Sequence, residues 1–454
     1  MKTGHILRIA PVAAAAMVAS AGALAQTQSD TAAELRQLRE ELRQLRPMQE
    51  EIQRLRGELD AVKRQQAATA SAAVATAGAP TAAPAQSGWG TSPPTTASNG
   101  SMTGSGVSLF GYGELSYSRP RRDSSAATAT AGRGVLGFAY RFNERTRMAA
   151  ELEVENAVVS ASDRGEVAFE QLYIERDLTD RIAAKAGLFL LPIGFLNETH
   201  EPTRYYGVNR NQVETAIIPT TWRELGLGLR GATEAGLRWD TGIVTGFDLN
   251  KWDATAADGR ESPLGAIHQE GQLARARSLA FYGALNYNGI PGVNVGGTLY
   301  HGGAGHKQAG FAGADARISL AEAHARWQVG RWDLSALAAR GRFTGVSALN
   351  ATFAGNPTPV PDSFGGWYAQ AAYRVWQQGD LSLVPFVRYE RLNTARGYSG
   401  LPAGLAPAIA PDIRTWTAGA NFYLHPQVVI KVDYQSFGND HNQDRLNLGV
   451  GFHF

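Results

Sequence analysis

The sequence predicts an all-β protein: a 16-stranded antiparallel transmembrane β-barrel with an inward-folded third long loop, preceded by a short α-helical coiled coil. Two observations support this fold class. Short segments of alternating polarity fill residues 107–454, and the connections between them are alternately short and long. The apolar and polar residues of these segments also fall on opposite faces. An even strand number, with short turns at one end and long loops at the other, is typical of a barrel that crosses a membrane.

The composition excludes several classes of protein. The chain has 454 residues, no cysteine and a formal net charge of +2. The lack of cysteine excludes a disulfide scaffold and a thiolate metal site. A charge so close to neutral argues against a nucleic-acid-binding protein that depends on phosphate contacts. The slightly negative mean hydropathy argues against a bundle of membrane helices, whereas a β-barrel needs lipid-facing residues only at alternate positions.

Three segments precede the expected barrel. Residues 1–25 have the charged start, apolar run and Ala23-Leu24-Ala25 cleavage site of a signal peptide; a membrane anchor helix is the alternative. Residues 26–66 carry a leucine heptad pattern interrupted near Pro47, which predicts a periplasmic coiled coil in two short pieces or in one piece with a local bend. The alternative for this segment is one amphipathic helix on another surface. Residues 67–106, rich in Ala, Pro, Ser and Thr, predict a flexible linker.

Sixteen strand candidates follow within 107–454, and their faces indicate a polar barrel interior. In the last candidate, Leu448 and Val450 share one face while Asn447 and Gly449 share the other. Three glutamates share one face of the candidate strand at 145–156. Exposure of an unpaired charge to lipid is energetically unfavourable, so this face should point to the barrel interior. A soluble sandwich or propeller is the alternative, but no blade repeat is visible. The candidates are 107–118, 133–142, 145–156, 165–177, 180–190, 222–231, 235–250, 277–288, 291–301, 316–328, 331–342, 364–376, 381–391, 412–424, 427–437 and 443–454.

The third long connection, 191–221, is the stretch around which the rest is organised. A loop of this length without secondary structure is uncommon in a compact domain unless it is functional or disordered. This one carries too many apolar side chains to stay in water, and many polar ones besides. A 16-stranded barrel leaves an aqueous channel, so the loop, folded inward, would narrow that channel. We expect the pore constriction to contain Glu198, His200, Glu201, Arg204, Arg210 and Glu214, and the pore wall Lys185, Arg326, Arg374, Arg388, Glu390 and Lys431.

Other chemistry has weaker support in the sequence. Glu198, His200 and Glu201 lie close together, but spacing on an irregular loop does not define a metal site, and a hydrogen-bonded brace between loop and wall fits them better. Acidic residues and histidines occur in or near the long loops, but nothing pairs them as catalytic groups. No glycine-rich phosphate-binding loop is found between a predicted strand and a predicted helix. We therefore expect no enzyme, no metal site and no cofactor.

Several stretches of the expected barrel match a known pattern. They are Gly111-Tyr112-Gly113-Glu114-Leu115, Pro192-Ile193-Gly194, Asn197-Glu198-Thr199-His200-Glu201-Pro202, Ile218-Pro219, Thr221-Trp222-Arg223-Glu224 and Val387-Arg388-Tyr389-Glu390-Arg391-Leu392. These stretches resemble bacterial outer-membrane porins, most closely the phosphate-selective porin O and P family. The resemblance covers about 107–454, and Phe454 looks like the terminal aromatic that the barrel-insertion machinery reads. It implies a homotrimer in outer-membrane lipid, with the third loop constricting each pore.

The function implied by this resemblance is passive diffusion of small hydrophilic solutes or ions, with phosphate and other anions among the candidates. The inward charges are mixed in sign, which also suits a general pore with a transverse field. The alternative is an envelope tether, in which the coiled coil and linker engage peptidoglycan and the barrel is mainly an anchor. Either way, we expect a protein of the bacterial outer membrane, with its N-terminal extension in the periplasm and no nucleic-acid partner.

Overall fold

The computed structural model describes Arg54, Gly57, residues 106–160 and residues 165–454. Arg54 and Gly57 are helical. The expected signal peptide and linker, and the rest of the expected coiled coil, lie outside the described residues. Among the helices that are described, none has the length and the apolar composition needed to cross a bilayer.

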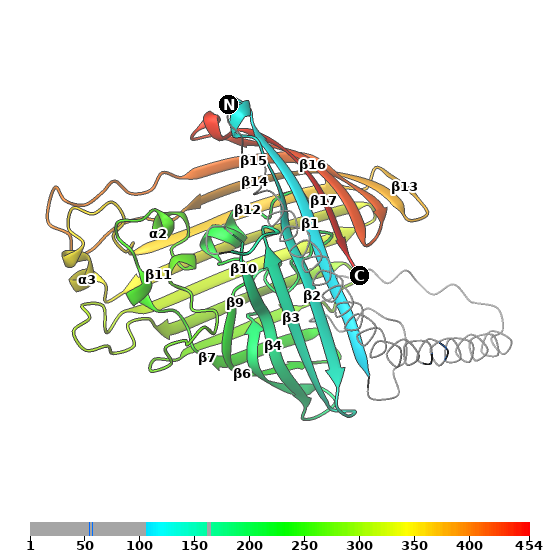
Figure 1. Ribbon diagram of the computed structural model, residues 1–454, viewed down its shortest axis with the longest axis horizontal. Coiled ribbons are helices and arrows are strands. Elements are labelled where there is room, and N and C mark those ends of the chain that lie inside the picture. Colours follow the sequence, from blue (N-terminus) through cyan, green and yellow to red (C-terminus); the bar gives the residue numbers. More distant parts are fainter. Residues whose placement is uncertain (1–53, 55–56, 58–105, 161–164) are drawn as a thin grey trace, which may run out of the picture. The chain divides into compact units, whose positions relative to one another are not determined.

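Within the described residues, sixteen antiparallel strands close into a barrel, which confirms the predicted architecture (Figure 1). Each strand pairs with its neighbour in sequence, and the first strand pairs with the last, which closes the ring. β12 and β13 both pair with β14 and form one interrupted strand. The first strands are β1 Val107–Pro120, β2 Thr128–Arg141, β3 Thr146–Glu155, β4 Val167–Asp177, β5 Ile182–Leu190, β6 Arg223–Ala232, β7 Leu237–Val244, β8 Ala280–Tyr287 and β9 Val293–Gly303. The others are β10 Arg317–Val329, β11 Trp332–Thr344, β12 Ser363–Tyr373, β13 Trp376–Gln378, β14 Leu381–Asn393, β15 Ile413–His425, β16 Val428–Phe437 and β17 Arg445–His453.

The connections alternate in length as the sequence predicts, so the barrel has a turn end and a loop end. Both β1 and β17 have their outer termini at the turn end, where Tyr112 pairs with His453. Short helical turns lie in the long loops: η1 Ser124–Ala126, η2 Val213–Ile217, η3 Leu249–Lys251, α2 Asp258–Glu261, η4 Gly265–Ile267, α3 Ser347–Thr352 and η5 His441–Gln443.

One predicted strand is too long. The candidate at 235–250 ends as β7 at Val244, and the chain then turns into the barrel. The Asp248 side chain accepts a hydrogen bond from the Asn250 backbone N–H and caps η3, which commits this segment to a helical turn. The apolar residues that follow β7 therefore belong to an inward-folded loop and not to the sheet.

The two faces of the strands separate apolar from polar side chains as predicted. On β16, Ile430 and Val432 point outward and are 42% and 39% exposed, while Lys431 and Asp433 point inward and are nearly fully buried. The outward apolar residues form the surface that a lipid-facing barrel requires. The inward charges are buried because the third loop covers them, so the polar face is largely an interface between wall and loop.

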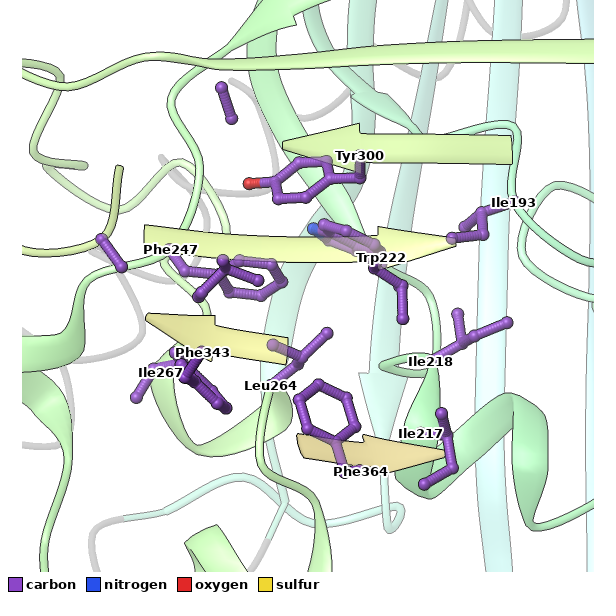
Figure 2. Packing of buried hydrophobic residues seen from close by; sticks show 14 of the residues in the cluster. Ile193, Ile217, Ile218, Trp222, Phe247, Leu264, Ile267, Tyr300, Phe343 and Phe364 are labelled. Atoms are coloured by element: carbon purple, nitrogen blue, oxygen red, sulfur yellow. The ribbon is translucent and has the colours of Figure 1, made fainter. Parts of the chain in front are cut away.

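A large apolar core fills part of the interior at the loop end, a feature that the sequence interpretation missed (Figure 2). Trp222 from the third loop packs against Phe247 and Tyr300, with ring centroids 4.8 and 4.7 Å apart. Leu264 and Phe364 complete the same cluster from loop 245–279 and from β12. β4, β5, β7–β12 and β14 all contribute side chains to this core, whereas the larger polar cavity described below lies against β1–β3, β16 and β17.

Candidate pore constriction

The third long loop, residues 191–222 and hereafter the inward loop, connects β5 to β6. The side chain of Asn197 links the first and last residues of this loop. Its Nδ2 donates to the carbonyl oxygens of Leu191 and Trp222 at 2.8 and 2.9 Å, and its Oδ1 accepts from the Trp222 backbone N–H at 2.7 Å. This side chain holds the two ends of the loop together, so the loop enters the barrel as one body.

His200 anchors the inward loop to the wall. Its Nδ1 lies 3.0 Å from the Asn197 carbonyl oxygen and its Nε2 lies 2.7 Å from the Tyr112 hydroxyl on β1. That hydroxyl donates to Glu170 on β4 at 3.0 Å. Burial alone would lower the pKa of His200, but the Glu170 carboxylate outweighs it and raises that pKa to about 9. The imidazole is therefore charged at neutral pH, and both ring nitrogens can donate.

A second contact with the wall lies beside the first. The Tyr205 hydroxyl donates to Glu114 Oε2 at 2.7 Å, and Arg133 Nε donates to Glu114 Oε1 at 2.7 Å. Arg133 also donates to the His200 carbonyl oxygen at 3.3 Å. β1 and β2 thus hold two successive parts of the loop through one ion pair.

Carboxylates of β14 and β16 hold the loop backbone directly. Glu390 on β14 accepts from the Gln212 N–H at 2.6 Å, and Asp433 on β16 accepts from the Val208 N–H at 2.6 Å. Each buried N–H would otherwise lack a partner. These inward acidic residues therefore support the loop, and their charge is directed at backbone donors.

Glu214 links two parts of the inward loop by hydrogen bonds. Its carboxylate accepts from the Phe195 and Leu196 N–H groups at 2.6 and 2.8 Å, and from the Tyr368 hydroxyl on β12 at 2.9 Å. Burial of this carboxyl raises its pKa, against the effect of these hydrogen bonds. Gly194, at φ +67°, passes so close that a Cβ there would lie 2.4 Å from Glu214 Oε1.

The inward loop packs against the last strand, on a surface around Gly449 and Gly451 that is hereafter called the seat of the loop. β17 carries Gly449 and Gly451 on its inward face, where a Cβ on Gly451 would lie 2.4 Å from the Pro202 Cβ. A Cβ on Gly449 would lie 3.0 Å from the nearer methyl carbon of Val208. The two glycines make room for apolar side chains of the loop, so the loop lies flat on the final strand.

Two cavities lie on either side of the inward loop. A cavity of about 490 Å³ opens toward the loop end, and one of about 310 Å³ lies at the turn end. The loop-end cavity is lined by loop residues 205–221 and by charged side chains of β1–β3 and β17, namely Glu114, Arg133, Glu155 and Arg445. The turn-end cavity is lined by Pro192 and Glu198 of the loop and by the charged residues Arg147, Asp177, Asp180, Arg181, Arg230, Arg238 and Asp240.

Charges of both signs line the inner wall, since Arg388 pairs with Glu390 on β14 and Lys431 lies two residues before Asp433 on β16. Glu151 and Glu153 on β3 and Glu170 on β4 are buried on the inner face. Arg388 on β14 and Lys431 on β16 are buried on another sector, with β1, β2 and β17 between. Lys431 Nζ lies 3.6 Å from the centroid of the Tyr205 ring, a cation–π contact with the loop.

The residues expected at the constriction fall into three sets. His200 and Glu214 are buried and hydrogen-bonded, as described above. Glu198 lines the turn-end cavity, and burial raises its pKa to about 7. Arg210 lines the loop-end cavity and donates to the Thr220 hydroxyl. Glu201 and Arg204 are half-buried, with Oε2 and Nε 4.0 Å apart.

The expected wall residues are largely paired. Lys185 Nζ donates to Asp240 at 2.8 Å, Arg326 binds Asp333, and Arg388 donates to Glu390 at 2.9 Å. Arg374 is exposed near the turn end, where it donates to Gln377 at 3.2 Å. In the part of the chain that the structure describes, no group of three or more His, Asp or Glu side chains could hold a metal ion.

Sequence reasoning missed Arg133, which contacts both Glu114 and the loop backbone. The only available signal was a lone charge among the small and apolar residues between Thr128 and Tyr140. The partners of that charge are distant in sequence, so its role could not be inferred without the ring order.

No protein-family model matches the chain. An uncharacterized protein of Aquifex aeolicus (strain VF5) is 29% identical over 338 residues, covering 72% of this chain and 75% of that protein. The solved structure of Salmonella typhi OmpF in complex with daunomycin matches with a TM-score of 0.53 at 12% identity, over 77% of this chain and 98% of that one. The outer membrane channel DcaP of Acinetobacter baumannii has a TM-score of 0.48 at 12% identity, over 78% and 99%. The OmpF likeness shows that the two chains share a barrel fold.

Proposed function

We propose that this protein is an outer-membrane porin, a channel for passive diffusion of small hydrophilic solutes and ions. The observation that carries the proposal is the inward loop with a charged cavity on each of its faces. Because the loop is braced at this position, it narrows the route between the two cavities. Passage of a solute along this route then depends on the width of the constriction and on the local charge. In this assignment the turn end faces the periplasm and the loop end faces the outside.

We infer a general pore in which ions of both signs pass, with phosphate among the anions. Both cavities carry acidic and basic side chains, and most wall charges form ion pairs. A pore dedicated to one anion would need a denser row of free cations. Glu198, Glu201, Arg204 and Arg210 are the residues that we assign to the charge filter.

We propose a homotrimer in outer-membrane lipid, inserted through recognition of the terminal Phe454, which is 59% exposed. β1 begins at Val107 at the turn end, which is the periplasmic side in this orientation. The tether alternative stays a prediction, because its coiled coil and linker lie outside the described residues.

The test is the conductance of the purified protein in a planar bilayer, with the reversal potential measured under a salt gradient. We expect stepwise conductance. Replacing Arg204 and Arg210 together with glutamate should shift the reversal potential toward that of a cation-preferring channel. Arg342→Glu is the control, because Arg342 is exposed and lies on β11 between the buried Gly341 and Phe343, so its side chain faces out of the barrel. Absence of conductance from correctly folded protein would contradict the proposal, and unchanged selectivity would remove both arginines from the filter.

A further inference from the structure

Outward-facing arginines gather at the loop end of one side of the barrel. Arg340 on β11, Arg391 on β14 and Arg414 on β15 are exposed and occupy outward positions of their strands. The pairing of β14 with β15 places Arg391 directly opposite Arg414. Arg340 lies opposite Gly365 on β12, the strand between β11 and β14 (Figure 1). Because Gly365 has no side chain, no bulky group of β12 separates the arginines at this level.

A row of aromatic side chains lies beside these arginines, farther from the loop end. Trp367 on β12, Tyr389 on β14 and Trp416 on β15 follow one another along the row, with ring centroids 5.4 and 4.8 Å apart. On β14 and β15, the arginine lies two residues closer to the loop end than the aromatic residue of the same strand. Outward aromatic rings of a membrane barrel mark the boundary between hydrocarbon and head groups. The arginines therefore lie at the depth of the lipid head groups.

The positive charge of this cluster is only partly neutralised. The Arg391 guanidinium binds the Asp412 carboxylate. Arg340 and Arg414 form no ion pair and no side-chain hydrogen bond with any residue that the structure describes. The nearby charged side chains at the loop end of these strands are more often basic than acidic, namely Arg317, Arg342, Arg396 and Lys307 against Asp315, Asp362 and Asp440. The cluster and its surroundings therefore keep an excess of positive charge.

Another sector of the barrel has a different outer surface at the same end. On β4 and β6–β8, the exposed outward side chains at the loop end are apolar, namely Val167, Phe169, Leu225, Ile243 and Phe281. Contact with water or with head groups in general would not require the arginines to gather on β11–β15. Their concentration there indicates a particular anionic ligand.

We propose that Arg340, Arg391 and Arg414 bind the head group of a glycolipid that carries two phosphates, with its acyl chains against Trp367 and Trp416. A guanidinium group presents its N–H donors in a planar fork that fits a phosphate. β11 and β14 are separated by β12, so their arginines lie about 10 Å apart across the sheet. Two phosphates on one head group can therefore bind on both sides of Gly365.

The site lies on the outer surface of the barrel and is independent of ion flow through the pore. Only its assignment to the outer leaflet rests on the proposed function, in which the loop end faces the outside. A test of lipid binding can therefore fail without any consequence for the channel, and conductance can fail without any consequence for the site.

The experiment measures lipid binding by the purified full-length protein in detergent. Native mass spectrometry counts the bound molecules at graded concentrations of diphosphoryl lipid A, with monophosphoryl lipid A and phosphatidylethanolamine as comparison lipids. We expect saturable binding of diphosphoryl lipid A and weaker binding of the two comparison lipids. Arg340→Gln combined with Arg414→Gln should weaken the binding of diphosphoryl lipid A about tenfold or more, because two charge-assisted contacts are lost.

The matched control is Arg145→Gln combined with Arg331→Gln, because both arginines are exposed at the turn end and the same charge is removed. The mobility of unheated samples on a gel verifies that both double variants contain a folded barrel. Equal losses of binding in the two double variants, or equal binding of the three lipids, would overturn the inference. Displacement of the lipid by an equal concentration of inorganic phosphate would also overturn it, since the site would then bind the free ion.

Discussion

His200 Nε2 lies 2.7 Å from the Tyr112 hydroxyl oxygen, although the two residues are 88 positions apart in the sequence. The contact joins the inward loop to the first strand, and the Tyr112 hydroxyl in turn donates a hydrogen bond to Glu170. The charge state of one buried imidazole is therefore among the factors that hold the loop in position.

Alkaline pH should loosen this anchor. The pKa of His200 is raised to about 9 from an ordinary value near 6.5. Its stabilising contribution is therefore fully present below about pH 6.5 and is lost as the pH rises through 9. Single-channel current noise should increase between pH 7 and pH 10. His200→Gln should be noisier at pH 7 and should change less over this range; an equal rise in the variant would exclude His200 as the cause.

Substitution of Gly451 by alanine should displace the loop from its seat. The added Cβ would lie 2.4 Å from the Pro202 Cβ, a clash that one part must relieve by moving. Overpacking of this kind costs about 1–3 kcal/mol. We expect a lower urea midpoint in detergent and an altered conductance. Gly134→Ala is the control, because a Cβ at Gly134 meets no atom within 4 Å. Equal behaviour of the two variants would argue against the seat.

Removal of the Glu214 carboxylate should destabilise the loop from within. Glu214→Ala leaves the N–H groups of Phe195 and Leu196 without their acceptor in a buried setting. Each such loss costs about 1–3 kcal/mol, so a total of roughly 3 kcal/mol is expected. Faster cleavage of the loop by protease, with the barrel intact on a gel, would report it. A variant as resistant as the wild type would mean that the wall contacts alone hold the loop.

Charge selectivity should change near neutral pH through Glu198. Burial raises the pKa of this carboxyl to about 7, with Lys185, Asp240, Arg230 and Glu175 the main charges around it. The group is neutral below that pH and negative above it, so cation permeability should rise between pH 6 and pH 8. Reversal potentials under a KCl gradient measure this change. Glu198→Gln should flatten the profile, and a profile that persists in the variant would assign the titration to another group.

The strands and their faces could be predicted because their signals are local. Alternation such as that of Ile430 and Lys431 needs only neighbouring residues. The inward loop was also predictable, from its length and its mixed composition. The apolar core around Phe247 and Leu264 was not, because loop residues have no period and their packing partners lie on other loops and on strands distant in sequence. The pairing of charges was equally hidden. Lys185 meets Asp240 across 55 positions, and such contacts depend on the order of strands around the ring.

The seat of the inward loop on β17 has a consequence for how the barrel assembles. Gly449 and Gly451 belong to the last strand of the chain, and Tyr112 and Glu114 belong to the first. Until these two strands pair, the surface that receives Pro202, Val208 and His200 is incomplete. A nascent barrel would therefore hold its loop unseated, and closure of the ring would complete the membrane seal and the filter in one event.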